Sequence, residues 1–339
     1  MNFEYIFSIK NKMGYKVITI LGNEFKFRST KARVSELEKI VKKMDSLLYI
    51  INSTADITKC KSATGDFRKL QMLRLKMLNL CVNIFDKNGI RYWLDYGTLI
   101  GVIRHKGFIP WDDDIDICML REDYQKAFNI LNTIFKDTDI FAELGGIGRL
   151  TSKSMKIKNK RNNLYYFDIF PFDICTNEEL VYDELLNKIK KIQSEIYPKW
   201  EKETPEVVTA KVIKEYAKYK ITVLDKPIKY LFRGLESMQH QGYQTIYKYE
   251  DIFPLKKMEF EGFKFFVPNK PDVSIKYANE KSYGDIMSFP PLSELSIHKA
   301  YENLKDREYV KFLVEDEKYV DNLAEKIGKK IRNMEDLCN

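Results

Sequence analysis

The sequence predicts a mixed α+β fold: a core with a small mixed β-sheet, a helical insertion, and an accessory N-terminal hairpin and helix. Apolar residues recur at helical spacing from Phe67 up to a stop at Asn88-Gly89, which is the pattern of an amphipathic helix. Short apolar strands then alternate with further helical stretches, as is typical of α/β or α+β architectures. The 339 residues are enough for one large domain or two smaller ones.

Four segments are expected along the chain. Residues 1–66 form an accessory part with a hairpin, a helix capped by Ser35 and a linker. The core covers residues 67–177, and a mostly helical insertion or subdomain covers residues 178–250. Residues 251–339 complete the core with Pro-rich ordered loops around a second hairpin, and they end in a charged helix.

Within these segments the individual elements follow from apolar spacing. The N-terminal hairpin is expected to join two alternating runs by a turn near Gly22-Asn23. This basic and apolar ribbon is most simply an accessory edge, and a membrane or partner contact is the alternative. Strands of the core are predicted near 91–94, 115–119, 140–144, 149–157 and 165–170, with helices beginning near Gly97 and Glu122.

The charge balance is modestly basic. Lysine and arginine outnumber aspartate and glutamate by 57 to 49, a formal net charge of +8. The simplest interpretation is a solvated, lysine-rich surface, and the sharper one is attraction to anionic nucleotides, glycan phosphates or a cytoplasmic membrane face. No nucleic-acid partner is indicated. We find no apolar stretch of membrane-spanning length and no signal-peptide pattern, so we expect a cytoplasmic protein, with a peripheral contact at the inner membrane face as an open addition.

The cysteines are spread through the chain without any CxxC pair. This pattern fits a reducing compartment and gives no zinc signature. They are Cys60, Cys81, Cys118, Cys175 and Cys338. Cys81 lies on an apolar helical stripe and Cys118 within an apolar strand, so both are expected to be small core residues.

The motif that carries chemistry is Asp114-Ile115-Asp116-Ile117. Side chains alternate along a strand, so both aspartates are expected on one face and both isoleucines in the core. Two carboxylates about 7 Å apart repel each other unless a cation lies between them, and Mg²⁺ typically takes one or two carboxylates plus substrate phosphates. Asp168, in an aromatic and aliphatic strand, supplies a third carboxylate. The three suggest a metal-dependent phosphoryl-transfer centre.

A simpler interpretation stays open for this acidic run. An Asp-x-Asp pair often occurs by chance, and Asp112 and Asp113 are expected to be loop or helix-cap residues. A calcium EF-hand is excluded, because the run lacks the required glycine and the terminal glutamate.

A short turn before the acids offers a place for phosphate. Gly97-Thr98 supplies backbone N–H groups and a hydroxyl at a helix start. Arg104 and Lys106 follow it, and Lys156 belongs to a later basic cluster, so that these cations can neutralise a diphosphate. For each lysine taken alone, solvated surface is the simpler interpretation.

These residues resemble a known family. The string from Trp93 through Gly97-Thr98 to Asp116, followed by Asp168, is similar to the LicD family, which has the nucleotidyltransferase fold and includes bacterial phosphocholine transferases, fukutin and fukutin-related protein. Further matches are Arg121–Tyr124, 167–173, Phe253-Pro254-Leu255, Phe260-Glu261-Gly262 and the segment from Tyr283 to His298. The zinc-binding cysteine cluster of the animal relatives has no counterpart in this chain.

The resemblance implies a reaction and a metal. A substituted phosphate moves from a CDP-activated alcohol, such as CDP-choline or CDP-ribitol, to a hydroxyl of a cell-surface glycan: capsule, lipooligosaccharide or teichoic acid. By position, Asp114 and Asp116 are implied to bind Mg²⁺ or Mn²⁺ with Asp168 as the third carboxylate. Asp168 can also accept the proton of the acceptor hydroxyl.

The resemblance also implies a set of donor-binding residues. Charge on the transferring phosphate and on the departing CMP would be stabilised by nearby cations and by the turn. His298 falls in the family's Pro-Pro…His segment, where a structural histidine and a phosphate or acceptor contact are both open. The candidates are Gly97, Thr98, Arg104, Lys106, Lys156 and His298.

Two other functions stay open. A sugar-nucleotide glycosyltransferase also uses Asp-x-Asp for its metal, although that motif usually follows a Rossmann-like half, whereas a Gly-Thr turn and a short helix precede it here. A catalytically silent nucleotide- or glycan-binding scaffold is the third, although a decayed site should have lost at least one of the three acids. The sequence does not identify the donor head group, the acceptor glycan or the oligomeric state.

Overall fold

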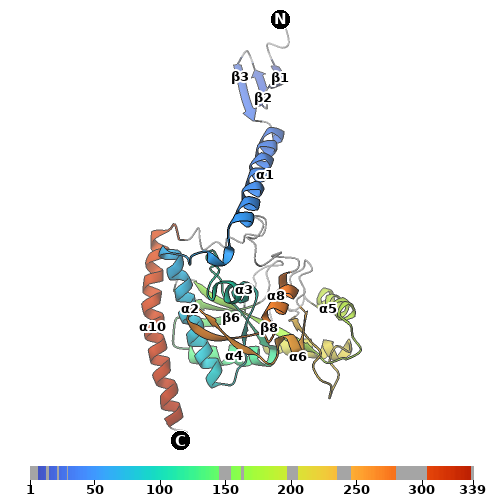
Figure 1. Ribbon diagram of the computed structural model, residues 1–339, viewed down its shortest axis with the longest axis vertical. Coiled ribbons are helices and arrows are strands. Elements are labelled where there is room, and N and C mark those ends of the chain that lie inside the picture. Colours follow the sequence, from blue (N-terminus) through green and yellow to red (C-terminus); the bar gives the residue numbers. More distant parts are fainter. Residues whose placement is uncertain are drawn as a thin grey trace. The chain divides into compact units, whose positions relative to one another are not determined.

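The computed structural model describes residues 7–12, 15–20, 23–28, 30–144, 154–161, 164–196, 205–234, 246–279 and 304–336. They form a mixed α+β structure, which confirms the predicted fold class (Figure 1). The chain divides into two compact units, residues 1–57 with 285–295 and residues 58–284 with 296–339. None of the helices in the described part of the chain is both long and apolar enough to span a bilayer.

The first unit contains a three-stranded antiparallel sheet. Strands β1 (Phe7–Lys12), β2 (Tyr15–Ile20) and β3 (Asn23–Arg28) pair in chain order. The predicted hairpin is β2–β3, with Ile20 opposite Asn23. Strand β1 was not predicted, and it completes the sheet by pairing with the other edge of β2.

Helix α1 (Thr30–Thr54) follows the sheet and starts earlier than predicted. Ser35 therefore lies inside the helix and is not its cap. The preceding residues include lysine, alanine and arginine, which are favourable in helices, so the helix extends a turn further toward the N-terminus. The apolar stripe that predicted this helix is exposed at Leu37, Ile40, Val41, Met44 and Leu47.

The second unit is built on a seven-stranded sheet. Its main path runs β10–β9–β8–β5–β4; β7 joins the edge of β8 opposite β5, and β6 pairs with β7. Only β5 and β8 are parallel among these neighbours, so the sheet is mixed. The strands are β4 (Trp93–Leu94), β5 (Asp116–Leu120), β6 (Ile140–Leu144), β7 (Met155–Asn159), β8 (Tyr165–Cys175), β9 (Tyr230–Arg233) and β10 (Ile246–Lys248).

Helices and one further hairpin complete the second unit. The hairpin β11 (Lys256–Phe260) and β12 (Phe263–Val267) confirms the one predicted in the Pro-rich segment. A short 3-10 turn, η2 (Ile57–Lys59), stands at the boundary between the units. The helices are α2 (Gly65–Lys87), α3 (Tyr96–His105), α4 (Arg121–Ile134), α5 (Tyr182–Ile196), α6 (Pro205–Lys218), α7 (Tyr249–Ile252), α8 (Pro271–Asn279) and α10 (Arg307–Asp336).

Helix α2 shows how the core is assembled from sequence spacing. It ends at Lys87, and Gly89 takes φ of +62°, a left-handed conformation that glycine adopts without strain. The expected positions for Cys81 and Cys118 are also confirmed, since both thiols are fully buried. The apolar stripe of α2 is buried at Leu70, Leu73, Met77, Cys81 and Phe85.

The C-terminal helix α10 lies alongside α2 (Figure 1). Lys76 of α2 donates to Glu317 at 2.9 Å. Asp316 of α10 is buried, accepts a hydrogen bond from Asn159 Nδ2 at 3.0 Å and pairs with Arg161 at 3.1 Å. These contacts attach α10 to the end of β7, beside the sheet.

Among the described residues of the stretch 178–250, the two long helices lie in the first part. Helices α5 and α6 confirm the predicted periodicity, and Ile189, Ile192 and Val212 are buried in one cluster. The later residues form β9 and β10, because their apolar side chains pair against β8 and extend the central sheet. The prediction that this whole stretch is mostly helical is therefore wrong for its last part, while its status as a separate domain stays a prediction.

Candidate functional site

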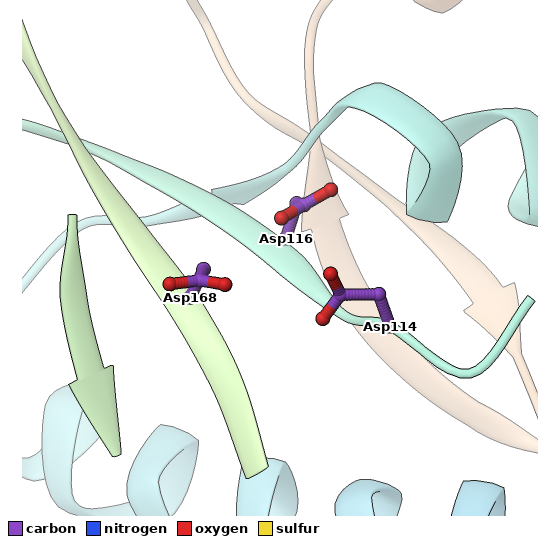
Figure 2. Close-up of side chains that lie close together, drawn as sticks. All are labelled: Asp114, Asp116 and Asp168. Atoms are coloured by element: carbon purple, nitrogen blue, oxygen red, sulfur yellow. The ribbon is translucent and has the colours of Figure 1, made fainter. Parts of the chain in front are cut away.

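The parallel pairing of β5 with β8 brings together two acids that are far apart in the sequence. Asp116 begins β5 and lies opposite Asp168 in β8. Paired residues of neighbouring strands point to the same face of a sheet, so both carboxylates lie on one side. Asp114 joins them from the loop before β5, as Figure 2 shows. One carboxylate oxygen of each residue lies within 4.8 Å of the others.

Asp114 reaches this cluster from outside the strand. The sequence predicted Asp114 and Asp116 on one strand, but β5 begins only at Asp116. The reason is local, because Asp112 Oδ1 accepts from the Asp114 N–H at 3.2 Å and Asp114 Oδ1 accepts from the Ile115 N–H at 2.9 Å. Such side-chain contacts compete with strand pairing, so the chain turns before it joins the sheet. The convergence of the two carboxylates is achieved by this turn (Figure 2).

The electrostatics of the cluster favour an added cation. Burial raises the pKa of Asp116 well above its usual value, and the charges of Asp114 and Asp168 raise it further. Asp168 accepts a hydrogen bond from Ser154 Oγ at 2.5 Å and another from Lys156 Nζ at 3.2 Å. Despite this lysine, the carboxylates still repel one another, because the charges of Asp114 and Asp168 raise the pKa of Asp116.

The donor atoms fit a hard divalent ion. Three carboxylates that converge from two strands and a loop offer only oxygen ligands, which Mg²⁺ and Mn²⁺ prefer. Mg²⁺ in particular is held by few protein carboxylates and completes its shell with water and substrate phosphate oxygens. The cluster can therefore hold a metal whose open positions face a phosphorylated ligand.

The Gly97-Thr98 turn contacts the acidic segment directly. Asp95 caps helix α3, and its carboxylate accepts from the Tyr96 N–H at 2.9 Å. Thr98 Oγ1 accepts from the Asp116 N–H at 2.8 Å, so this hydroxyl holds the start of β5 in place. A Cβ on Gly97 would lie 2.8 Å from Asp112 Oδ2, so any larger residue would require the Asp112 side chain to shift. The turn is thus placed at the site, and phosphate binding by it stays a prediction.

The predicted cations are not all brought to the acids. Lys156 is, through its pair with Asp168. Arg104 is buried with its guanidinium 5.6 Å from the Trp111 ring centre, and burial lowers the pKa of Arg104 to about 10. Lys106 is exposed at the end of α3 and forms no ion pair with the described residues. His298 lies outside the described residues, so its role stays untested.

The neighbours of the cluster carry buried pairs of another kind. Asp113 was expected in a solvated loop or cap, but it is buried and pairs with Arg74, Nη1 to Oδ2, at 2.8 Å. Asp173 accepts from Arg121 Nε at 2.6 Å and from the Tyr216 hydroxyl at 2.5 Å. Asp113 lies in a loop as predicted, but it is not solvated, because an arginine from α2, distant in the sequence, compensates its charge.

Sequence reasoning missed two residues next to the acids. Ser154 precedes β7 and hydrogen-bonds Asp168. Arg233 ends β9, and its charge opposes the rise in the pKa of Asp116. No motif surrounds either residue, and only the strand pairing of β7 and β9 with β8 brings them near the cluster.

Comparison with known proteins identifies a family domain in this chain. The nucleotidyltransferase domain described as LicD/FKTN/FKRP matches residues 89–201. Lipopolysaccharide cholinephosphotransferase LicD of Haemophilus influenzae is 29% identical over 262 residues, which are 69% of this chain and 96% of that relative. The chain carries a LicD-family domain. The resemblance predicted from the sequence is thereby confirmed.

Other relatives match shorter stretches of this chain. Ribitol 5-phosphate transferase FKRP of Mus musculus is 29% identical over 100 residues, 27% of this chain and 18% of that relative. An uncharacterized protein of Rickettsia prowazekii is 32% identical over 110 residues, 32% of this chain and 41% of that relative. The named relatives are phosphocholine and ribitol phosphate transferases, so the comparisons support a phosphotransferase that acts on glycans.

Proposed function

We propose that this protein is a metal-dependent phosphotransferase that moves a substituted phosphate from a CDP-activated alcohol to a hydroxyl of a cell-surface glycan. The observation that supports this function is the convergence of Asp114, Asp116 and Asp168 on one side of the β5–β8 pair (Figure 2). All three acids lie within the residues that match the LicD-family domain.

The three acids would have separate tasks in this reaction. Asp114 and Asp116, with Asp168, would hold Mg²⁺ or Mn²⁺, which when bound neutralises phosphate charge and lowers the barrier to attack. Asp168 is held by Ser154 and Lys156, which orient its carboxylate on the face where an acceptor would lie. In that position it accepts the proton of the attacking hydroxyl.

The transfer would form one bond to phosphorus, break another and release one proton. The acceptor oxygen forms a bond to the β-phosphorus while the bond from that phosphorus to the CMP oxygen breaks. CMP leaves with the bonding electrons, and the acceptor proton passes to Asp168 and then to solvent. Lys156 lies beside Asp168 and would stabilise negative charge on the phosphate during transfer.

Phosphocholine is the group we propose to be transferred. The matched segment covers 96% of the Haemophilus cholinephosphotransferase but only 18% of mouse FKRP. A reducing, cytoplasmic location is proposed with it, since the four described cysteines form no disulfide. The acceptor would be a lipopolysaccharide-type or other surface glycan precursor, reached in solution or at the inner membrane face.

The test is release of CMP from a panel of donors. Purified protein with Mg²⁺ or Mn²⁺ would be given CDP-choline, CDP-ethanolamine, CDP-ribitol and CDP-glycerol, each with and without a glycan acceptor. We expect acceptor-dependent CMP release, highest with CDP-choline and abolished by EDTA. Release of UDP from a UDP-sugar without any CMP would instead indicate a glycosyltransferase. Nucleotide binding without turnover on any acceptor would indicate a scaffold.

A further inference from the structure

The described part of the second unit contains four buried arginines, and their charges have different partners: Arg74, Arg104, Arg121 and Arg233. Arg104 Nε donates to His105 Nε2 at 3.0 Å. Arg74 and Arg121 each pair with an aspartate, at 2.8 Å and 2.6 Å. Arg233 is 8% exposed, as deeply buried as Arg121, yet among the described residues it forms no ion pair. Its Nε has no hydrogen-bond partner among the residues that the structure describes. Because a buried charge without a directly contacting counter-charge is costly, this arrangement favours an anionic ligand.

Strand pairing places Arg233 on the face of the sheet that carries the acids. Arg233 lies opposite Phe172 in the antiparallel β8–β9 pair, so the two side chains share a face. Along β8, alternation puts Phe170 and Asp168 on that same face. Arg233 is the last residue of β9, and that end of β9 is the one nearest Asp168 along β8.

Aromatic rings hold the guanidinium in this position. Its Cζ lies 4.2 Å from the ring centre of Phe170 and 5.2 Å from that of Tyr96. The two rings meet edge to face, with centres 5.4 Å apart. The rings contact the guanidinium and attract it weakly through cation–π interactions, but they carry no negative charge. The N–H groups of Arg233 can therefore still donate charge-assisted hydrogen bonds to an anion.

The charge balance of the proposed reaction needs one more cation. The negative charges of the three carboxylates would be neutralised by one divalent ion and by Lys156. No positive charge of these groups would then remain to neutralise a donor diphosphate. A planar guanidinium matches two phosphate oxygens at once, which an ammonium group cannot do. Arg233 is a buried cation on the face of the acids that forms no ion pair within the described part of the chain.

We propose that Arg233, held between Phe170 and Tyr96, binds the diphosphate of the nucleotide-activated donor. The proposal rests on the proposed function in taking a nucleoside diphosphate as ligand. It adds a donor-binding residue from outside residues 89–201, which the family domain covers. It also assigns β9 a role in substrate binding.

The test measures binding of diphosphates to the full chain by calorimetry in the presence of Mg²⁺. The probes are CDP and inorganic pyrophosphate, the variants are Arg233→Gln and Arg233→Lys, and the control is Arg91→Gln. Arg91 also contacts an aromatic ring, with its Cζ 6.0 Å from the centre of Phe253, but it pairs with Asp123. We expect Arg233→Gln to weaken both probes by about 10- to 100-fold, which is the range of hydrogen bonds to charged groups.

The controls separate binding from folding. Arg233→Lys keeps the charge without the fork, so its affinity should fall between those of the wild type and Arg233→Gln. Arg91→Gln should bind both probes like the wild type. If Arg233→Gln does not fold, the weakened binding of Arg233→Lys at unchanged melting temperature carries the test.

The outcomes separate this proposal from the proposed function. Arg233-dependent pyrophosphate binding without CMP release from any CDP-alcohol would refute the function and keep the diphosphate site. CMP release with equal CDP affinity in the wild type and both Arg233 variants would keep the function and overturn the site. A wild type that binds neither probe would also overturn it.

Discussion

Asp113 and Asp114 are neighbours in the chain, yet their carboxylates lie in opposite surroundings. Asp113 is buried against Arg74, which compensates its charge at 2.8 Å. The Asp114 carboxylate converges instead with those of Asp116 and Asp168 (Figure 2). Of two consecutive aspartates, one therefore forms a buried ion pair and the other belongs to a cluster of like charges.

The same contrast recurs along β8. Asp173 accepts from Arg121 and Tyr216, so its charge is compensated inside the fold. Asp168, five residues earlier, contacts Ser154 and the partly exposed Lys156 and faces Asp116 across the β5–β8 pair. Removal of a compensated aspartate should cost stability. Removal of an aspartate from the acidic cluster should cost function and not stability, because like-charge repulsion within the cluster opposes folding.

The largest effect is expected from Asp116→Asn, measured as the rate of CMP release from CDP-choline with acceptor. Loss of a metal ligand removes several kcal/mol of charge stabilisation in the transition state, so the rate should fall roughly a thousandfold or more. The melting temperature should stay the same or rise, because a like charge has been removed. The exposed Asp137→Asn is the control and should change neither property. Wild-type turnover by Asp116→Asn would refute the metal role.

The next effect is expected from Asp173→Asn, measured by urea unfolding. The substitution leaves the Arg121 guanidinium buried without a full counter-charge, which should lower the free energy of unfolding by about 3 kcal/mol. Below its melting temperature the variant should keep the wild-type rate of CMP release, because Asp173 lies outside the acidic cluster. Equal stability with lost activity would instead assign Asp173 the role expected of Asp168.

A smaller effect is expected from adding the metal itself. A divalent ion that binds only the folded state, at ten times its dissociation constant, stabilises it by about 1.4 kcal/mol. Mg²⁺ or Mn²⁺ should therefore raise the melting temperature of the wild type and of Asp173→Asn, and leave that of Asp116→Asn unchanged. Sodium at equal ionic strength controls for screening. An equal rise in all three proteins would place the ion elsewhere.

The smallest effect is expected from Lys156→Gln compared with Lys158→Gln. Both lysines lie on β7, where Lys156 pairs with Asp168 and Lys158 with Glu143. A partly exposed pair contributes less than about 1 kcal/mol to stability, so both variants should fold alike. Only Lys156→Gln should slow CMP release, by about tenfold, through loss of one charge-assisted contact. A similar rate for both variants would remove Lys156 from the site.

Much of the fold follows from local patterns. The stripe of α2, the hairpins β2–β3 and β11–β12, and strand β6 are placed by residue spacing and turn residues, and local physics suffices for them. Local patterns fail where partners are remote. The early start of α1, strand β1, and the change from helix to strand at β9 and β10 depend on pairing or on weak propensities.

The candidate site divides in the same way. The sequence by itself identified the candidate metal ligands, Asp114, Asp116 and Asp168, because these aspartates have apolar neighbours in the sequence that favour burial. Only the tertiary structure decided that Asp113 is neutralised by Arg74 and that Arg233 lies on the acidic face without a direct ion pair to any described residue. The reason is that compensation of a buried charge depends on residues brought together by α2 and β9. No spacing along the chain encodes those distances.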